Sequence, residues 1–310
     1  NLSINEGEFF VIMGLSGSGK STLLRCINRL IRPTAGQVLV NGVDISKISE
    51  KELLQVRRKE LAMVFQNFGL LPHRSVLSNI AFGLELQGVK KEEREKKAME
   101  SMKLVGLKGY ENQMVGELSG GMQQRVGLAR ALANNPEVLL MDEAFSALDP
   151  LIRVQMQDEL LKLQEKMQKT IIFITHDLGV VANMADRIGV MYAGKLVETG
   201  TADDIFYSPA HPYTCALLSA MPDVDTNDRL EAIPGTPPNM IYPPVGDAFA
   251  DRNKYALKID FEMQPPMFKI SDTHYAATWL LHPDAPKVEI PKIITDRIAR
   301  MKEKGGKSNA

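Results

Sequence analysis

The glycine-rich segment of residues 14–21 has the residue types and spacing that bind phosphate. It reads GLSGSGKS, which satisfies the pattern G-x-x-x-x-G-K-[ST], and it lies between the apolar run FFVIM and the helical pattern TLLRCINRLI. Glycines allow backbone N–H groups to close around phosphate oxygens, and a helix N-terminus adds a favourable partial charge. The segment therefore predicts a loop that holds the phosphates of a nucleoside triphosphate.

Two side chains of this loop have distinct expected roles. Lys20 is expected to reach the β and γ phosphates, and the hydroxyl of Ser21 is expected to bind Mg²⁺. The other predicted nucleotide contacts in the loop are Gly14, Ser16, Gly17, Gly19 and Thr22.

Two consecutive carboxylates follow the apolar run VLLM. Asp142 and Glu143 would lie at the carboxyl end of a strand, where ligands sit in open α/β sheets. Asp142 is the candidate for the metal, and Glu143 is the candidate to orient or deprotonate the attacking water. An acidic pair at a strand end also occurs in ordinary surface loops, so by itself this pair leaves both readings open.

A second phosphate-facing helix start is predicted in LSGGMQQRVGLARAL, residues 118–132. Ser119, Gly120 and Gly121 lie just before a strongly helical run. A single triphosphate does not obviously need two such helix ends from the same chain.

Together these motifs resemble the ATPase subunit of ABC transporters. In that family, the LSGGMQ signature of one subunit caps the γ-phosphate that the other subunit's phosphate loop holds. The resemblance therefore implies a head-to-tail dimer around two ATP molecules, with the signature contacts made by Ser119, Gly120, Gly121 and Gln123.

The same resemblance assigns three further residues. Gln66, in MVFQNFGLLPH, resembles the glutamine that contacts ATP-bound Mg²⁺ and signals to the membrane subunit. Asp149, in SALD, resembles a residue of the loop that crosses the dimer interface. His176, in ITHDL, resembles the histidine that contacts the γ-phosphate and holds Glu143 and the water in place.

Alternating apolar strands and helical patterns predict an α/β fold, and the resemblance makes it a P-loop NTPase of the ABC type. EVLLMDE and TIIFITH read as buried parallel strands, with a helix from about residue 153 to 167 between them. Residues 73–117 read as mostly helical. After about residue 208 the chain becomes rich in proline, which predicts an irregular appended region that does not continue the sheet.

The predicted domain organisation has two parts. Residues 1–230 form the ATPase domain, with a helical subdomain at about 66–135, and residues 231–310 form an extension of the oligopeptide-permease type.

Composition limits the partners. Lysine plus arginine (37) nearly equals aspartate plus glutamate (38), so no basic field favours nucleic acid. No apolar run approaches the roughly 18 to 20 residues that cross a bilayer. Cys26 and Cys215 are far apart and lack metal-site spacing, which indicates buried thiols in a reducing compartment.

The first and second parts of the chain resemble two different branches of importer ATPases. Residues 1 to about 169 resemble the subunit of glycine betaine and other quaternary-amine importers. Residues from about 170 to 310, with THDLGVV, HPYTCALLSAMP and IPGTPPN, resemble the subunit of oligopeptide and dipeptide importers. The chain thus reads as a chimera, with a seam near TIIFIT.

The resemblance also implies cofactors and partners. ATP and Mg²⁺ are expected. An iron–sulfur cluster is not, because the positions where many oligopeptide relatives carry cysteine hold Asp247, Asn253, Asp260 and Thr278. The expected partners are a second ATPase subunit, integral-membrane permease subunits and, indirectly, an extracytoplasmic substrate-binding protein. The subunit is placed at the cytoplasmic face of the membrane through its permease.

The resemblance implies that the permease selects the substrate. In the family, the ATPase subunit contacts the permease through a segment that corresponds to about residues 66–117 here. This segment lies in the part that resembles the quaternary-amine branch, which favours a quaternary amine over a peptide. A soluble ATPase of translation or DNA repair is disfavoured, because one signature and no coiled-coil insertion occur. A nucleotide-binding module without turnover stays open, since the family's adenine-stacking first strand is expected to be missing and the seam crosses the core. Lys20, Asp142, Glu143 and His176 favour turnover.

Overall fold

Strand β1 (Phe9–Met13) is entirely buried and leads through the glycine-rich loop into helix α1 (Lys20–Ile27) of the computed structural model. The described residues are 2–66, 68–145, 150–176, 178–220, 233–289, 294–296 and 299. They form two compact units: unit 1 comprises residues 1–10 and 21–175, and unit 2 comprises residues 11–20 and 176–310.

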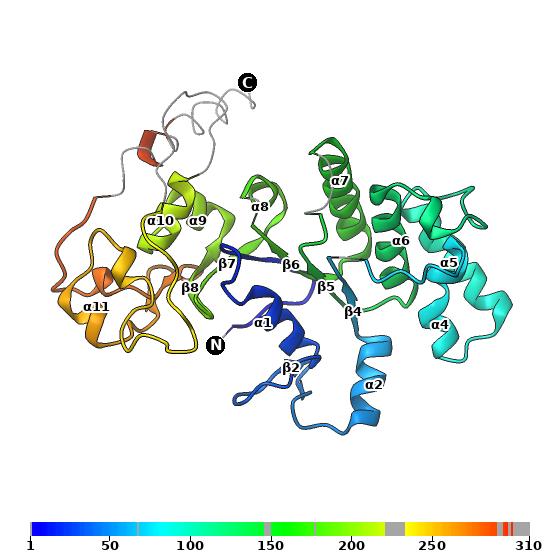
Figure 1. The fold of residues 1–310 in the computed structure, drawn as a ribbon, viewed down its shortest axis with the longest axis horizontal. Helices are drawn as coiled ribbons and strands as arrows, with labels where there is room; N and C mark the ends of the chain where they lie inside the picture. The colour runs from blue at the N-terminus through cyan, green and yellow to red at the C-terminus, as the bar shows by residue number, and fades with distance from the viewer. Residues whose placement is uncertain are drawn as a thin grey trace. The chain divides into compact units, whose positions relative to one another are not determined.

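Unit 1 is built on three neighbouring parallel strands, β4 (Leu61–Val64), β5 (Val138–Asp142) and β6 (Thr170–Thr175). The register pairs Leu61 with Val138 and Val138 with Thr170. Continuous apolar runs are typical of parallel strands covered on both faces. Figure 1 shows this cover, with α1 and α7 (Pro150–Met167) on opposite faces of β5 and β6. The predicted strands are confirmed.

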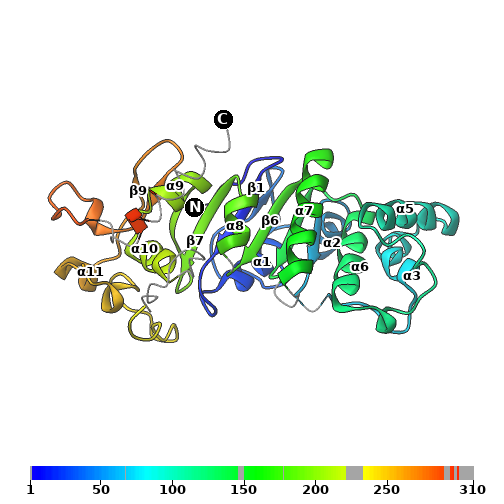
Figure 2. The ribbon, with the colours of Figure 1, turned by 90° about the horizontal axis from the view of Figure 1, so that it is seen from above.

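Unit 1 also contains further helices. They are α2 (Glu50–Lys59), α3 (Val76–Ile80), α4 (Phe82–Leu86), α5 (Lys91–Leu104), the 3₁₀ turn η1 (Val115–Glu117) and α6 (Gly120–Ala133). Helices α3, α5 and α6 pack against one another and form a group of their own (Figure 2). The prediction of a mostly helical stretch at 73–117 is confirmed.

Two predicted helix ends were misplaced. Helix α7 begins at Pro150, three residues before the predicted start at Arg153; proline suits a first turn because its missing N–H has no helical partner there. Helix α1 ends at Ile27, well before Pro33, and Arg29 just beyond it has a left-handed φ of 51° that cannot continue a helix.

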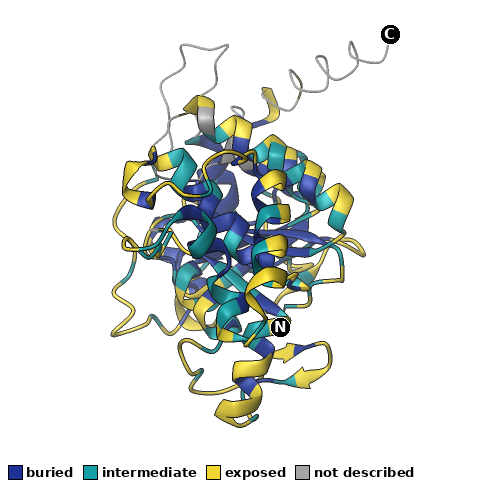
Figure 3. Cartoon of the chain, turned by 90° about the vertical axis from the view of Figure 1, so that its right-hand side faces the viewer, coloured by how far each residue is buried: buried dark blue, intermediate teal, exposed yellow. Residues whose placement is uncertain are grey.

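A hairpin of β2 (Leu39–Val40) and β3 (Val43–Asp44) turns at Asn41 and Gly42. Both turn residues have positive φ, 49° and 78°, as a type I′ turn requires. The hairpin is largely exposed, in contrast to the buried strands (Figure 3). A small cluster of buried side chains anchors it, namely Val40, Ile45, Leu53, Val56 and Leu61.

Unit 2 contains an antiparallel set of strands in the order β7 (Arg187–Tyr192), β8 (Lys195–Thr201), β10 (Tyr275–Ala276) and β9 (Phe268–Lys269). Its helical elements are α8 (Leu178–Met184), α9 (Ala202–Tyr207), α10 (Pro212–Ser219), η2 (Ala250–Arg252), α11 (Lys258–Glu262) and η3 (Trp279–Leu281).

The described residues after 208 are irregular over most of their length, as predicted, but the expectation that this region does not continue the sheet is wrong. Tyr275 pairs with Thr199, and Ala277 donates its N–H to the carbonyl of Val197 at 2.8 Å. The edge of β8 offers backbone groups that need partners, and a two-residue strand is enough to supply them. The predicted domain boundary at residues 230 and 231 lies outside the described residues and stays a prediction.

The four polar residues at the expected cysteine positions are all buried and each accepts a local backbone hydrogen bond. Asp247 accepts the N–H of Phe249 at 3.1 Å, and Asp260 accepts the N–H of Leu257 at 2.6 Å. Asn253 and Thr278 cap their own turns in the same way. Burial, with a smaller contribution from nearby Asp260, raises the pKa of Asp247 to about 6.

This raised pKa predicts a pH-dependent stability. The folded chain holds the Asp247 proton more tightly than the unfolded chain, so the contribution is complete below about pH 4 and is lost as pH rises through about 6. Asp247→Asn stays neutral and keeps an oxygen for Phe249, so its stability relative to the native chain should rise by about 1.4 kcal/mol between pH 5 and pH 7.5.

Thermal or urea unfolding at both pH values measures the difference. Asp251→Asn, a change at an exposed neighbour, is the matched control and should follow the native chain. A constant difference between Asp247→Asn and the native chain across this pH range would contradict the assignment.

Candidate functional site

The first glycine of the phosphate loop is required by a close backbone approach. A Cβ at Gly14 would lie 2.2 Å from the carbonyl oxygen of Met191. The loop is then shaped by its own peptides, since Ser18 donates its N–H to the Leu15 carbonyl at 3.2 Å and accepts from the N–H of Gly194 at 2.9 Å. The predicted loop is thus a rigid backbone turn within unit 2.

Lys20 is buried, and its ammonium contacts the carbonyls of its own loop. Nζ donates to the Gly14 oxygen at 2.8 Å and to the Leu15 oxygen at 3.0 Å. A buried ammonium needs such acceptors to offset its lost hydration. Ser16 and Gly17 are exposed and Gly19 is half-buried, so the loop backbone is open to a ligand beside this cation.

Ser21 contacts Asp142, the other residue that the sequence analysis gave as a candidate Mg²⁺ ligand. Its Oγ donates to Asp142 Oδ1 at 2.6 Å, although the two residues are 121 positions apart. Asp142 is buried at the end of β5, and Arg25 of α1 lies 3.6 Å from its second oxygen. Two hard oxygen donors in contact suit a Mg²⁺ site, and Arg25 balances the charge of the carboxylate. Thr22 is exposed beside them.

Glu143 and Gln66 follow neighbouring strands and contact each other. Gln66 Nε2 donates to Glu143 Oε2 at 3.4 Å. Glu143 has a left-handed φ of 46°, and its N–H is held by the carbonyl of Ile174 at 3.2 Å. A left-handed conformation outside glycine is costly and is often found at functional sites. The structure thus brings together two residues that the sequence assigned separately.

The signature segment forms the predicted helix start. Ser119 is the N-cap of α6, and its side chain accepts the N–H of Met122 at 3.4 Å. Gly120 and Gly121 begin the first turn, a Cβ at Gly120 would meet nothing within 4 Å, and Gln123 donates to the Leu118 carbonyl at 3.1 Å. Ser119 and Gly120 are exposed, so this end is open to a partner.

Helix α6 also holds the two segments that follow the catalytic candidates, which sequence reasoning missed. Gln124 donates to the carbonyl of Ala144, next to Glu143. Arg130 donates to the carbonyls of Phe68 and Gly69, at 2.6 and 2.8 Å, close after Gln66. Arg25 could have been found, because it lies one helical turn after Ser21. Nothing in the sequence links Arg130 to residues 61 and 62 positions away.

Two further assignments stay predictions. His176 is exposed and directly follows β6. Asp149 lies outside the described residues.

Two protein families match different parts of the chain. The family described as ABC transporter matches residues 1–146, and the family described as Oligopeptide/dipeptide transporter, C-terminal region matches residues 197–259. The oligopeptide transport ATP-binding protein OppD of Bacillus subtilis is 48% identical over 97% of this chain and 88% of that protein. The glycine betaine/proline betaine transport protein ProV of Escherichia coli is 62% identical over 69% of this chain and 53% of its own length.

Solved structures show the same cassette. The dimeric bacterial ABC transporter cassette MJ0796 is 39% identical, with a TM-score of 0.61 over 65% of this chain and 88% of that one. A second structure of MJ0796 contains ADP and phosphate in a post-hydrolysis state.

The chain belongs to the ATP-binding proteins of ABC transporters. It is an ABC-type ATPase with the predicted α/β cassette fold, and it matches both the glycine betaine and the oligopeptide branches, as the sequence indicated. Among the described residues, no helix is long and apolar enough to cross a membrane.

The contacts of Arg130 give a testable prediction. Arg130→Gln is too short to keep both carbonyl contacts, so it should cost about 1–2 kcal/mol of stability and speed hydrogen exchange at residues 68–75. Exchange monitored by mass spectrometry measures this, with Arg94→Gln on α5, which loses one long contact of 3.5 Å, as the matched control. Equal exchange at 68–75 in both variants would remove Arg130 from this role.

Proposed function

We propose that this chain hydrolyses Mg-ATP as a subunit of an importer and drives solute uptake through a partner permease. The observation that carries the proposal is the contact of Ser21 Oγ with Asp142 Oδ1 at 2.6 Å, where Ser21 directly follows the buried Lys20 of the phosphate loop in the sequence. These oxygens would hold Mg²⁺, which supplies charge neutralisation on the phosphates.

The remaining residues divide the work of hydrolysis. Lys20 and the loop N–H groups bind the phosphate oxygens, because a cation and converging donors favour the negative charge of the triphosphate. Glu143 orients the attacking water and takes its proton. The Gln66 amide, whose Nε2 lies 3.4 Å from Glu143 Oε2, helps to orient that carboxylate. We assign His176 to the γ-phosphate on the basis of its place after β6.

A second subunit completes the site in this proposal. Ser119, Gly120, Gly121 and Gln123 form a helix start that is open to an anion, and no nucleotide of the same subunit needs it. We infer a head-to-tail dimer in which each signature caps the ATP held by the other subunit. ATP binding then closes the dimer and hydrolysis reopens it, which shifts the permease between two states.

The favoured substrate class is glycine betaine and related quaternary amines. The segment that would contact the permease, about residues 66–117, lies in the part of the chain that resembled the quaternary-amine branch. The 62% identity with ProV over 213 residues supports this choice. The permease and an external binding protein would select the solute, and the subunit would be peripheral at the cytoplasmic membrane face.

A peptide importer is the second candidate. It is favoured by the 48% identity with OppD over nearly the whole chain and by the match of residues 197–259 to the oligopeptide C-terminal region. The two candidates differ in which permease the subunit binds.

The role of Glu143 predicts the behaviour of Glu143→Gln. The variant should bind ATP and accumulate as a closed dimer, while turnover falls by about 10²–10⁴-fold because the general base is lost. Phosphate release and size-exclusion chromatography with ATP measure these effects. Glu137→Gln, at the exposed other end of β5, is the matched control with native turnover. Near-native turnover in Glu143→Gln would exclude this role, and a native chain that binds ATP without turnover would favour a binding module.

The choice of importer is tested by co-purification. The tagged subunit is expected to recover quaternary-amine permease subunits in ATP and Mg²⁺, because the coupling segment resembles that branch. Oligopeptide permease subunits are the parallel sample. Recovery of the peptide permease alone would reverse the substrate assignment and show that the C-terminal part governs assembly.

A further inference from the structure

We propose that Tyr213 is a positioning residue for ATP binding: its hydroxyl fixes the first peptide group of the phosphate loop, on which the ammonium of Lys20 rests. The inference deepens the proposed function, because it depends on Lys20 and its loop binding the phosphates. Tyr213 lies on α10, within the region that matches the oligopeptide C-terminal family and 198 positions from the loop.

The contact restrains one peptide group from both sides. Leu15 donates its N–H to Tyr213 Oη at 2.9 Å. The carbonyl of the same peptide group belongs to Gly14, and it accepts from Lys20 Nζ at 2.8 Å. A trans peptide is planar, so its N–H and its carbonyl point in opposite directions and rotate together. Tyr213 and Lys20 therefore fix the orientation of this group between them.

The orientation of this peptide group affects the position of the Lys20 ammonium. Lys20 also donates to the Leu15 carbonyl at 3.0 Å, so the ammonium contacts the peptide group that contains the Leu15 N–H and the peptide group that follows it. Without the hydroxyl, that N–H loses its partner and the Gly14–Leu15 peptide can rotate. The ammonium would then spread over several positions, and the phosphates would bind a less organised site.

The ring of Tyr213 is held by an aromatic cluster in unit 2. It is fully buried, with its centroid 4.5 Å from that of Tyr192 and 5.4 Å from that of Phe249. Arg252 donates to the Tyr192 hydroxyl at 3.0 Å. Burial raises the pKa of Tyr213 to about 12, so the hydroxyl stays neutral at physiological pH.

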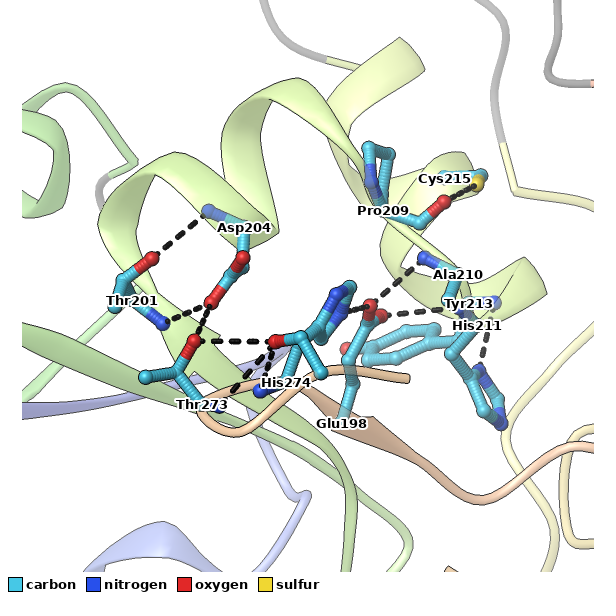
Figure 4. Close-up of polar contacts among 11 residues, drawn as sticks. Glu198, Thr201, Asp204, Pro209, Ala210, His211, Tyr213, Cys215, Thr273 and His274 are labelled. Atoms are coloured by element: carbon cyan, nitrogen blue, oxygen red, sulfur yellow. Dashed lines mark hydrogen bonds and ion pairs between the residues drawn. The ribbon is translucent and has the colours of Figure 1, made fainter. Parts of the chain in front are cut away.

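The backbone of Tyr213 is held from the other side by a buried carboxylate (Figure 4). Glu198 of β8 accepts the N–H groups of Ala210 and His211, at 2.7 and 3.0 Å, and its Oε1 lies 2.7 Å from His274 Nε2. His211 Nδ1 then accepts the N–H of Tyr213 at 3.0 Å. Burial lowers the pKa of His211 to about 4, which keeps its ring neutral and able to accept at neutral pH.

These contacts give the C-terminal region a part in nucleotide binding. Phe249, Arg252 and His274 all follow residue 233, and each contacts a residue that holds Tyr213 or Tyr213 itself. The region thus acts on the loop through one hydroxyl, without contacting the nucleotide.

The test removes that hydroxyl alone. In the full chain, Tyr213→Phe should raise the KM for ATP about 5- to 10-fold, the loss expected for one hydrogen bond, with kcat within about twofold of the native value. Tyr192→Phe is the matched control: it removes a hydroxyl of the same aromatic cluster that bonds Arg252 and not the loop, so its KM should stay native even if its unfolding temperature falls.

A second measurement does not depend on activity. Hydrogen exchange of the nucleotide-free chain should be faster at residues 14–18 in Tyr213→Phe than in Tyr192→Phe or the native chain. Native KM and native exchange in Tyr213→Phe would overturn the inference, and so would an equal rise of KM in both variants, which would reveal general loosening. A native chain that binds no ATP would instead overturn the proposed function, and this inference with it.

Discussion

The placement of one buried ammonium is the constraint on which the rest of the site depends. Lys20 cannot be withdrawn from water without acceptors, and the structure supplies them from the backbone of its own loop at 2.8 and 3.0 Å. That arrangement requires the loop to curl tightly, which in turn requires glycine at position 14 against the Met191 carbonyl. Carbonyl dipoles bind a cation less strongly than phosphate oxygens do, so the ammonium can exchange its carbonyl acceptors for the phosphate oxygens of a ligand.

Helix α6 contacts two separate segments of unit 1 that carry candidate site residues. Its first turn carries the signature residues, its second turn carries Gln124, and its last turns carry Arg130. Gln124 and Arg130 contact the segments that follow Glu143 and Gln66, so a rigid helix joins a surface offered to a partner with two segments of the catalytic group. A small rotation of this helix would shift both segments, because packed elements move as units rather than deforming continuously.

Local patterns predicted what local physics determines. The runs VLLMD and TIIFIT became neighbouring parallel strands, because apolar content and period act over a few residues. The same local rules placed Asp142 at the end of a buried strand, as the structure shows. The Ser21–Asp142 contact joins the first turn of α1 to the carboxyl end of β5.

What the sequence did not predict depends on distant partners. The end of α1 at Ile27 and the pairing of Tyr275 with Thr199 are decided by tertiary context rather than by propensity. The contacts of Arg130 with Phe68 and of Tyr213 with Leu15 join positions that no spacing rule connects. Residues that support a site in this way carry no motif of their own, so they emerge only when the fold is known.

The four capped turns of the C-terminal region have a consequence for the order in which it forms. Asp247, Asn253, Asp260 and Thr278 each accept an N–H no more than three residues away, so these turns close short loops at little entropic cost. The link between His274 and Glu198 closes a loop of 76 residues. Local turns should therefore appear early during folding and the strand pairing of β10 with β8 late, which makes the edge of that sheet the last part of the region to be sealed.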